Sequence, residues 1–309
     1  LYEQADLARP RSAAMTAAAM ISPLSEVVVS ERLIYDMGIR SLALWPEWLA
    51  ALNSASTTPV GYNDKGSVVV AHPQDMAELA QFAADLDHHL GADNTAQWLN
   101  RAELRALEPG LSNQFQAGML LPGEAYLDNR QLLHNLHHRI VALGGEIVDN
   151  SQVAMQPAFT VNGQAPDGVD LVIDCRGVGA SDNTEVRGVR GEVIWVETPE
   201  VRFERAIRLM HPRYKLYMVP KPGNAFIVGA TEIESSDRSP MSVQSALELC
   251  SALYAINPAF AEARIRELDV NLRPSLLDNL PRIAWLDDRK QVALNGLYRH
   301  DYLLAPCLI

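Results

Sequence analysis

The chain has 309 residues and a mass of 34.0 kDa, long enough to bury a large core and to fold as two closely connected domains. Its net charge of −12 excludes nucleic acids and anionic membranes as favoured partners, because both would repel it. No apolar run reaches the roughly 18 residues that suggest a membrane-spanning helix. Its cysteines, Cys175, Cys250 and Cys307, lie far apart in apolar segments, which predicts buried, reduced thiols in the cytoplasm.

The chain begins with Leu1-Tyr2-Glu3, a short apolar strand that ends in an acidic residue. The second strand of a dinucleotide-binding βαβ unit ends in this way, and its carboxylate accepts hydrogen bonds from the adenosine ribose. In such a unit a glycine-rich phosphate-binding turn precedes this strand, whereas the first glycine here is Gly38. We therefore expect a cofactor enzyme whose chain, as given, starts after that turn.

Apolar residues recur at helical spacing in several segments. They predict helices over residues 27–52, 73–90, 129–143 and 243–254. Pro46 lies inside the first and predicts a kink or a restart there, whereas Pro73 stands at the start of the second, where a helix tolerates proline. Gly144 and Gly145 end the third.

Short apolar runs between these helices predict strands. Residues 60–62 and 67–71 flank the turn Asn63-Asp64-Lys65-Gly66 and predict a β-hairpin. Further strands are expected at 146–148, 152–155, 169–175, 192–196, 206–210, 216–219, 225–228, 283–286 and 292–295. Strands and helices alternate at both ends, with an antiparallel run between them, which predicts an α/β plus α+β fold with one discontinuous domain. The apolar segment 303–309 is expected to begin another element, so we expect the chain to be cut at both ends.

Two polar residues lie in otherwise apolar strands. Arg273, within Asp269-Val270-Asn271-Leu272-Arg273-Pro274, requires an anionic partner when buried, and its planar fork matches a carboxylate. The alternative is a structural ion pair with an acidic residue of the chain. Tyr217, within Leu216-Tyr217-Met218-Val219-Pro220, is either a core tyrosine or a hydroxyl aimed at a ligand.

Two further motifs are weaker. Gly177-Val178-Gly179-Ala180-Ser181-Asp182 resembles GxGxxG, but Asp182 replaces the third glycine and no helical period follows. It is either a strand end at which the backbone approaches a cofactor closely or a plain tight turn. His134 and His138 are spaced for metal chelation on a helix, but no HExxH motif accompanies them, so we expect no metal site.

Several segments, taken in chain order, resemble the D-amino-acid-oxidase-like flavoenzymes, and most closely the glycine oxidases of thiamine biosynthesis. The matching segments are the Ala-rich 12–23, the strand and glycine turn 174–180, the loop 188–192, the tyrosine-bearing strand 211–220, and 229–232, 272–274 and 297–306. The resemblance implies an incomplete, Rossmann-like FAD-binding domain and an antiparallel-sheet substrate-binding domain, an architecture of the D-amino-acid-oxidase/glutathione-reductase-2 type. The first domain would comprise residues 1–56, 145–187 and 276–309, and the second residues 57–144 and 188–275.

The resemblance also implies roles for single residues. Arg273 would clamp the substrate carboxylate, Tyr217 would donate its hydroxyl to the same group, and Arg299 would lie near substrate and flavin. Glu3 would bind the ribose of a non-covalent FAD, and Val153 would contact its adenine side. The remaining residues expected to line the cofactor, beside Arg273 and Arg299, are Ala18, Met20, Gly177, Gly179, His300, Tyr302 and Leu303.

The activity implied is oxidative deamination of glycine or another small amino acid or amine, for thiazole synthesis. The α-hydrogen would pass as hydride to flavin N5, and oxygen would reoxidise the flavin to give hydrogen peroxide. The resemblance also implies a cytoplasmic protein that forms homo-oligomers, tetramers being frequent among relatives. The alternatives are a sarcosine or D-amino-acid oxidase or a dehydrogenase of the same family, and a non-catalytic fragment or scaffold that does not retain FAD.

Three departures from the family pattern bear on cofactor binding. Ala19 and Asp301 stand where the family usually has glycine, and Asp301 adds a negative charge in the loop expected to wrap the flavin. The phosphate-binding turn is absent from the sequence as given. Without its N–H donors, FAD affinity would fall by several kcal/mol, since charge-assisted hydrogen bonds contribute roughly 1.5–3 kcal/mol each.

Overall fold

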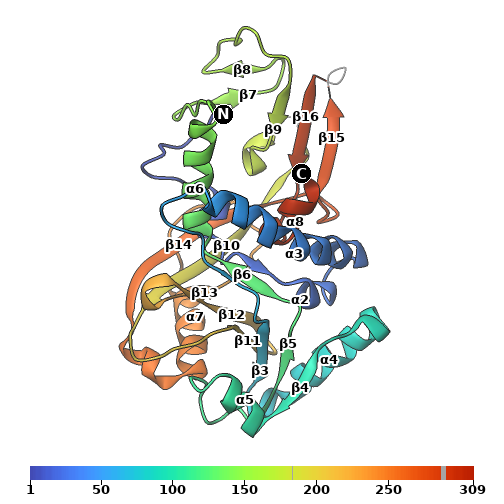
Figure 1. Ribbon diagram of the computed structural model, residues 1–309, viewed down its shortest axis with the longest axis vertical. Coiled ribbons are helices and arrows are strands. Elements are labelled where there is room, and N and C mark those ends of the chain that lie inside the picture. Colours follow the sequence, from blue (N-terminus) through green and yellow to red (C-terminus); the bar gives the residue numbers. More distant parts are fainter. Residues whose placement is uncertain (183, 287–289) are drawn as a thin grey trace.

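The computed structural model describes residues 1–182, 184–286 and 290–309, without the side chains of residues 214 and 215 (Figure 1). Its largest sheet has strand order β14-β10-β13-β12-β11-β3-β5-β4. These strands are β3 (Ser67–Ala71), β4 (Gln97–Asn100), β5 (Ala117–Leu121), β10 (Arg187–Glu197), β11 (Ala206–His211), β12 (Tyr214–Lys221), β13 (Ala225–Gly229) and β14 (Arg264–Ser275). Neighbouring strands are antiparallel except for β11 and β3, so the predicted antiparallel run is confirmed.

Three smaller sheets accompany the large one in the described residues. Their strands are β1 (Met20–Ile21), β6 (Ala125–Leu127) and β2 (Tyr62–Asn63); β15 (Arg282–Leu286), β16 (Gln291–Asn295) and β9 (Val172–Asp174); and β7 (Val153–Ala154) with β8 (Thr160–Val161). The first residues lie beside residues 146–148, because Tyr2 pairs in parallel with Val148 and Glu3 N donates to Val148 O over 2.9 Å. In Figure 1 this region and strands β7–β9, β15 and β16 lie together at one end of the molecule.

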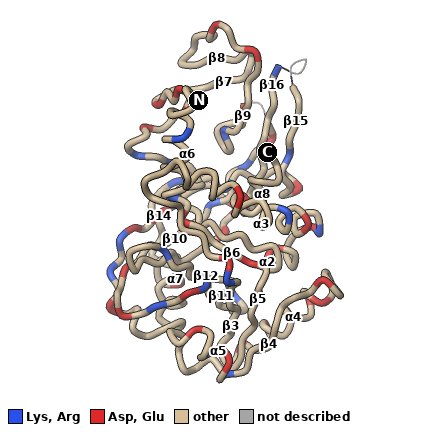
Figure 2. The backbone as a smooth tube through the Cα atoms, viewed as in Figure 1, with Lys and Arg blue, Asp and Glu red and all other residues tan. Residues whose placement is uncertain are grey.

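The helices are α1 (Ala13–Thr16), α2 (Pro23–Val27), α3 (Arg32–Asn53), α4 (Met76–Leu90), α5 (Arg101–Leu107), α6 (Asn129–Ala142), α7 (Val243–Ile256) and α8 (Asp301–Leu308). Acidic and basic residues are interspersed along the backbone, so no single element carries the negative charge (Figure 2). Among the described residues, no helix is both long enough and apolar enough to cross a membrane.

Strand alternation on the large sheet separates a packed face from a face that serves the site. On β11, Ile207 and Leu209 are buried in a cluster that includes Leu249 and Leu253 of α7. Arg208, between them in sequence, therefore points to the opposite face. That face also carries Tyr217 of β12, which stands directly opposite Arg208 in the strand register.

The helix predicted over residues 27–52 is confirmed as α3 for most of its length, but its predicted start was wrong. α2 ends at Val27 and α3 begins at Arg32, and the helix does not restart at Pro46. The helix continues past the proline because its inner face is packed, with Trp45 and Leu49 each 4% exposed.

The predicted hairpin is also wrong, since β2 pairs with β6, whereas β3 pairs with β11 and β5 in the large sheet. Every residue of β3 is buried, so this strand needs a partner on each side. The cysteines are free as predicted, but Cys175 is exposed and Cys250 and Cys307 are half-buried, so their predicted burial was wrong. Cys175 follows β9, which lies at the edge of its sheet.

Candidate functional site

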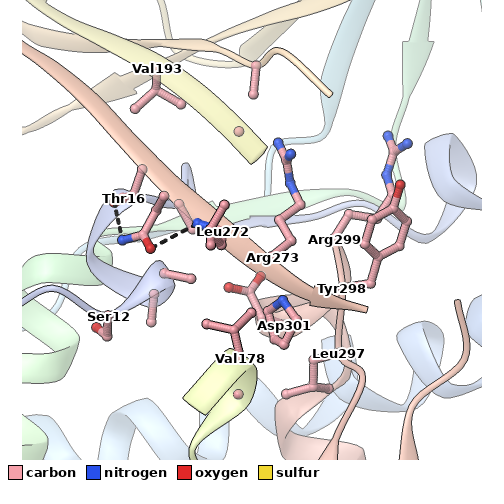
Figure 3. A pocket seen from close by; sticks show the side chains of 18 of the residues that line it. Ser12, Thr16, Val178, Val193, Leu272, Arg273, Leu297, Tyr298, Arg299 and Asp301 are labelled. Carbon is pink, nitrogen blue, oxygen red and sulfur yellow. Dashed lines mark hydrogen bonds between the residues drawn. The ribbon is translucent and has the colours of Figure 1, made fainter. Parts of the chain in front are cut away.

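A cleft of about 2150 Å³ extends from the first residues to the inner face of the large sheet. Its walls are the Ala-rich segment around α1, the 3-10 turn η3 (Gly177–Ala180), strands β10, β12 and β14, and the segment that leads into α8. Figure 3 shows Arg273 of β14, and Arg299 and Asp301 of the segment that leads into α8, projecting into this region. The volume exceeds the roughly 300–1,000 Å³ of sites for drug-sized molecules and suits a dinucleotide together with a small substrate.

Two glycines on the sheet give Arg273 and Tyr217 their positions. A Cβ at Gly191 of β10 would lie 2.5 Å from Arg273 Nη1, and a Cβ at Gly229 of β13 would lie 3.0 Å from Tyr217 Oη. The guanidinium therefore lies over β10 and the phenol ring over β13, which are neighbouring strands. The structure thus brings together the two residues that the sequence suggested for carboxylate binding.

Neither of these side chains has its hydrogen-bonding capacity filled by the described protein. Arg273 Nη1 donates to Thr231 O (3.1 Å) and Arg190 O (3.4 Å), and no described carboxylate forms an ion pair with it. The hydroxyl of Tyr217 faces the cleft with no hydrogen-bond partner among the described groups. Burial raises the pKa of Tyr217, so the phenol stays protonated and able to donate at neutral pH.

Arg299, in contrast, is engaged by two carboxylates. Its Nε lies 2.9 Å from Glu26 Oε2, and its Nη1 donates to Glu232 Oε2 over 3.0 Å. Tyr298 donates its hydroxyl to the same Glu232. Burial by itself would raise the pKa of Glu26, but Arg299, a hydrogen bond from His300 and the charge of Arg208 together lower it to about 2. Arg299 therefore lies at the cleft with its charge already matched.

Glu26→Gln is expected to lower the free energy of unfolding by about 2 kcal/mol at pH 7, because it leaves the half-buried Arg299 with one carboxylate instead of two. The folded-state pKa of Glu26 lies below its usual 4.5, so its contribution is full above pH 4.5 and is lost as pH falls toward 2. The stability difference between variant and wild type in urea unfolding should therefore be clearly smaller at pH 3 than at pH 7, because the loss is complete only near pH 2. Equal differences at pH 7 and pH 3 would contradict this, and Glu234→Gln, at an exposed carboxylate, is the matched control.

The residues expected at the adenosine end also line the cleft. Glu3 accepts from Ala5 N through Oε1 (2.9 Å), and no described cation pairs with its carboxylate. Gly177 has a φ of +56°, which favours glycine, and its carbonyl accepts from Asn295 Nδ2 over 2.9 Å. Arg176 ties this turn to β7 by donating to Val153 O (3.0 Å) while it pairs with Asp174 and Asp182. Val153 and Gly179 are lining residues as well.

Hydrogen bonds from distant elements hold the Ala-rich wall, which carries Ala18 and Met20. Nζ of Lys221 on β12 donates to Ala18 O (2.8 Å) and Leu127 O (2.7 Å), and lies 3.5 Å from Asn129 Oδ1. Asn129 Nδ2 in turn donates to Ala14 O and Met15 O. Lys221 was not identified from the sequence, where it simply ends an apolar strand.

Ala19 in this wall has a φ of +54°, a left-handed conformation that costs a residue with a Cβ roughly 1–2 kcal/mol. This is the position at which the family pattern usually has glycine. Ala19→Gly is expected to raise the free energy of unfolding by about 1 kcal/mol, as measured by urea denaturation. Ala17→Gly, at an extended residue, is the control and should not stabilise the protein. A loss of stability in Ala19→Gly would contradict the strain assigned to this position.

In the segment that leads into α8, some residues line the cleft and others are buried behind it. Asp301 and Leu303 line the cleft, whereas the buried side chains of His300 and Tyr302 lie behind it. Tyr302 donates its hydroxyl to Ala14 O over 2.9 Å. Burial raises the pKa of Asp301 to about 6, so its carboxylate is mostly ionised at neutral pH.

The fold and the cleft agree with the sequence comparison. A family model described as FAD dependent oxidoreductase matches residues 1–308. The chain belongs to this family. The predicted FAD-dependent family, with its mixed α/β fold and antiparallel sheet, is therefore confirmed.

Individual members of the family align over most of the chain. The putative thiamine biosynthesis oxidoreductase ThiO of Rhizobium etli is 37% identical over 293 residues, which are 94% of this chain and 81% of that protein. The bifunctional protein ThiO/ThiG of Trichormus variabilis is 25% identical over 96% of this chain, which spans 46% of that longer protein. The crystal structure of glycine oxidase from Geobacillus kaustophilus has the same fold, with a TM-score of 0.82 at 23% identity. The match covers 99% of this chain and 84% of that chain.

The residues that line the cleft fit the family's FAD. Glu3 offers a carboxylate without a described counter-ion, Gly177 exposes backbone at the end of β9, and alanine side chains leave one wall open to a flat ring. Asp301 is the exception, because it adds a negative charge to the wall that leads into α8.

Proposed function

We propose that this protein uses FAD to oxidise glycine, or another small amino acid or amine, as a step in making the thiazole of thiamine. One observation carries the proposal. Arg273, which forms no described ion pair, and Tyr217, which has no described hydrogen-bond partner, lie over neighbouring strands in one cleft. The names of the relatives, a thiamine biosynthesis oxidoreductase and a glycine oxidase, support the same activity.

In this proposal the protein contributes mainly orientation. Arg273 binds the substrate carboxylate through its planar fork, and the protonated Tyr217 donates to the same group. Two contacts on one carboxylate fix the direction of the Cα–H bond, which lowers the entropic part of the barrier. FAD, when bound, accepts a hydride from that carbon and passes the electrons to oxygen, giving hydrogen peroxide. Arg299, held by Glu26 and Glu232, shapes the entrance.

Glu3 is proposed to bind the ribose of FAD. Val153 is proposed to contact its adenine side, and Gly177 and Gly179 are proposed to line the cofactor. Ala18, Met20, Leu303 and the backbone around His300 and Tyr302 are proposed to face the flavin. The domain division at 1–56, 145–187 and 276–309 against 57–144 and 188–275 is proposed as well. It is supported by the large sheet, which takes nearly all its residues from the second set. We further propose a cytoplasmic homo-oligomer, in line with the sequence-distant, unpaired cysteines.

The test is to purify the protein, record its flavin absorbance near 450 nm after incubation with FAD, and assay peroxide release with glycine, sarcosine and D-alanine. The proposal expects a bound flavin and peroxide release that depends on glycine. Preference for sarcosine or D-alanine would assign the other oxidase activities considered above. A folded protein that retains no flavin and oxidises none of the three would instead be a scaffold.

A further inference from the structure

Backbone carbonyls hold one corner of the Arg273 guanidinium. Nη1 donates to Thr231 O over 3.1 Å and to Arg190 O over 3.4 Å. A Cβ at Gly191 would lie 2.5 Å from Nη1, 2.7 Å from Cζ and 2.8 Å from Nη2, so the guanidinium lies flat on the backbone of β10. Nε and Nη2 have no hydrogen-bond partner among the described groups, and such a pair of N–H groups can bind both oxygens of a carboxylate. The direction of this pair therefore depends on how firmly the carbonyls at Nη1 are held.

Thr231 depends on Glu192 of β10 for its position. It lies beyond Gly229, the last residue of β13, and so outside the ladder that joins β13 to β10. Thr231 N donates to Glu192 O over 3.3 Å. The Thr231 hydroxyl donates to Glu192 Oε2 over 3.0 Å and accepts from Glu192 N over 3.0 Å. The hydroxyl thus makes two of the three hydrogen bonds that join the two residues.

Glu192 is itself fixed by a buried ion pair. Its side chain is fully buried, and its Oε1 accepts from Arg190 Nε (3.1 Å) and Nη2 (2.6 Å). Burial by itself would raise its pKa, but hydrogen bonds from Ser245, Arg190 and Thr231 together lower it, so the carboxylate stays ionised at neutral pH. Nη1 of Arg190 donates further to Asp237 O over 2.9 Å, which ties the pair to the loop that follows Thr231.

This ion pair lies on the side of β10 away from the cleft. Gly191 and Val193 line the cleft, and because side chains alternate along a strand, Arg190 and Glu192 point to the opposite face. Neither of these two is among the described residues that line the cleft. The pair can therefore act on a bound substrate only through the residues that it holds.

We propose that Glu192 and Thr231 are positioning residues for the substrate carboxylate. Glu192 fixes Thr231, the carbonyl of Thr231 holds Nη1 of Arg273, and Nε and Nη2 then meet the carboxylate in one orientation. The proposal rests on the proposed function, because it is there that Arg273 binds this carboxylate. The contact exists before and during hydride loss, so loosening it acts mainly on binding and little on kcat.

The test is Thr231→Val, which keeps the shape of the side chain and removes the hydroxyl that contacts Glu192. The KM for glycine is expected to rise about 5-fold, as for the loss of one ordinary hydrogen bond, with kcat nearly unchanged. The dissociation constant of acetate, which has the carboxylate but no amine, should rise by the same factor, measured from the change in flavin absorbance. Thr231→Ser keeps the hydroxyl and should restore both constants to within about 2-fold of wild type.

A double variant separates positioning from a general loss of stability. In an Arg273→Ala background, Thr231→Val should change kcat/KM for glycine by less than about 2-fold, because the residue through which it acts is gone. Thr198→Val is the matched control and should leave the KM unchanged. The hydroxyl of Thr198 also accepts a backbone N–H, from Glu200 over 3.3 Å, but this residue follows the other end of β10 and does not line the cleft.

An unchanged acetate dissociation constant in Thr231→Val, or an equal effect with and without Arg273, overturns this inference. Thr231→Ala, which places no methyl group against the Glu192 carboxylate, covers the case in which Thr231→Val does not fold, and is judged by the same two results. If the flavin-loaded wild type neither binds acetate nor oxidises glycine, the proposed function fails. Wild-type acetate binding and glycine oxidation that the Thr231 variants leave unchanged overturn this inference alone.

Discussion

Arg273→Ala is expected to raise the KM for glycine by about 100-fold, with a much smaller change in kcat. The variant removes two charge-assisted hydrogen bonds to the substrate carboxylate, which together stabilise the complex by about 3 kcal/mol. That contact is made equally before and during hydride loss, so its removal acts mainly on binding. Steady-state peroxide assays over a wide range of glycine concentrations measure both constants.

Arg266→Ala is the matched control, because Arg266 lies on the same strand, is exposed, and pairs with Glu197 over 2.7 Å. The flavin content of each protein should be recorded from its absorbance, since Arg273 is also proposed to contact FAD. An Arg273→Ala protein with an unchanged KM would contradict the proposed role. A protein with an unchanged KM and reduced flavin content would assign Arg273 to the cofactor alone.

Wild type is expected to gain about 2 kcal/mol of stability relative to Lys221→Met between pH 7.5 and pH 9.5. Lys221 is 8% exposed and has no described carboxylate partner, and burial lowers its pKa to about 7. Between pH 7 and 10.5 the unfolded chain therefore holds a proton on this lysine that the folded protein has lost. Stability rises with pH wherever the unfolded state binds more protons, at about 1.36 kcal/mol per pH unit for one proton.

The hydrogen bonds of Lys221 are compatible with a neutral amine, whose two N–H groups match the short contacts to Ala18 O and Leu127 O. Lys221→Met leaves both carbonyls without this donor, but it also removes the cost of burying a cation. The unfolding free energies of wild type and Lys221→Met therefore differ less at pH 7.5 than at pH 9.5. Urea denaturation at both pH values provides the measurement. Lys65→Met, at an exposed lysine paired with Glu204, is the control, and a pH-independent difference for Lys221→Met would refute the assignment.

Arg273 and Tyr217 could be identified from the sequence because each is a polar residue in an otherwise apolar strand, and because family motifs flank them. Arg208 also lies in an apolar strand, between Ile207 and Leu209, but the carboxylate nearest to it, Glu124, is far away in the chain. Glu26 and Arg299 are 273 residues apart, and nothing local to either residue indicates their pairing. The sequence thus identified the polar residues, whereas their electrostatic partners could be identified only from the fold.

The strands of the second half were predicted well because each is a distinct apolar run between turns. The hairpin predicted over residues 60–71 was wrong for a different reason. A turn sequence specifies a local chain reversal but does not specify the partner of each strand. Strand β3 finds its neighbours in β11 and β5, which are remote in sequence. Strands β4, β5 and β6 were not predicted. β4 is largely exposed and β6 has only three residues, which weakens the signal of both.

The Ala-rich wall takes its shape from the rest of the molecule. The carbonyls of Ala14, Met15, Ala18 and Ala19 accept hydrogen bonds from Asn129, Tyr302, Lys221 and Leu127, which belong to α6, α8, β12 and β6. A wall held in this way unfolds together with those elements and does not fray alone. The cofactor-facing surface is therefore preorganised, and little of the binding free energy of a flat ligand is consumed in ordering it.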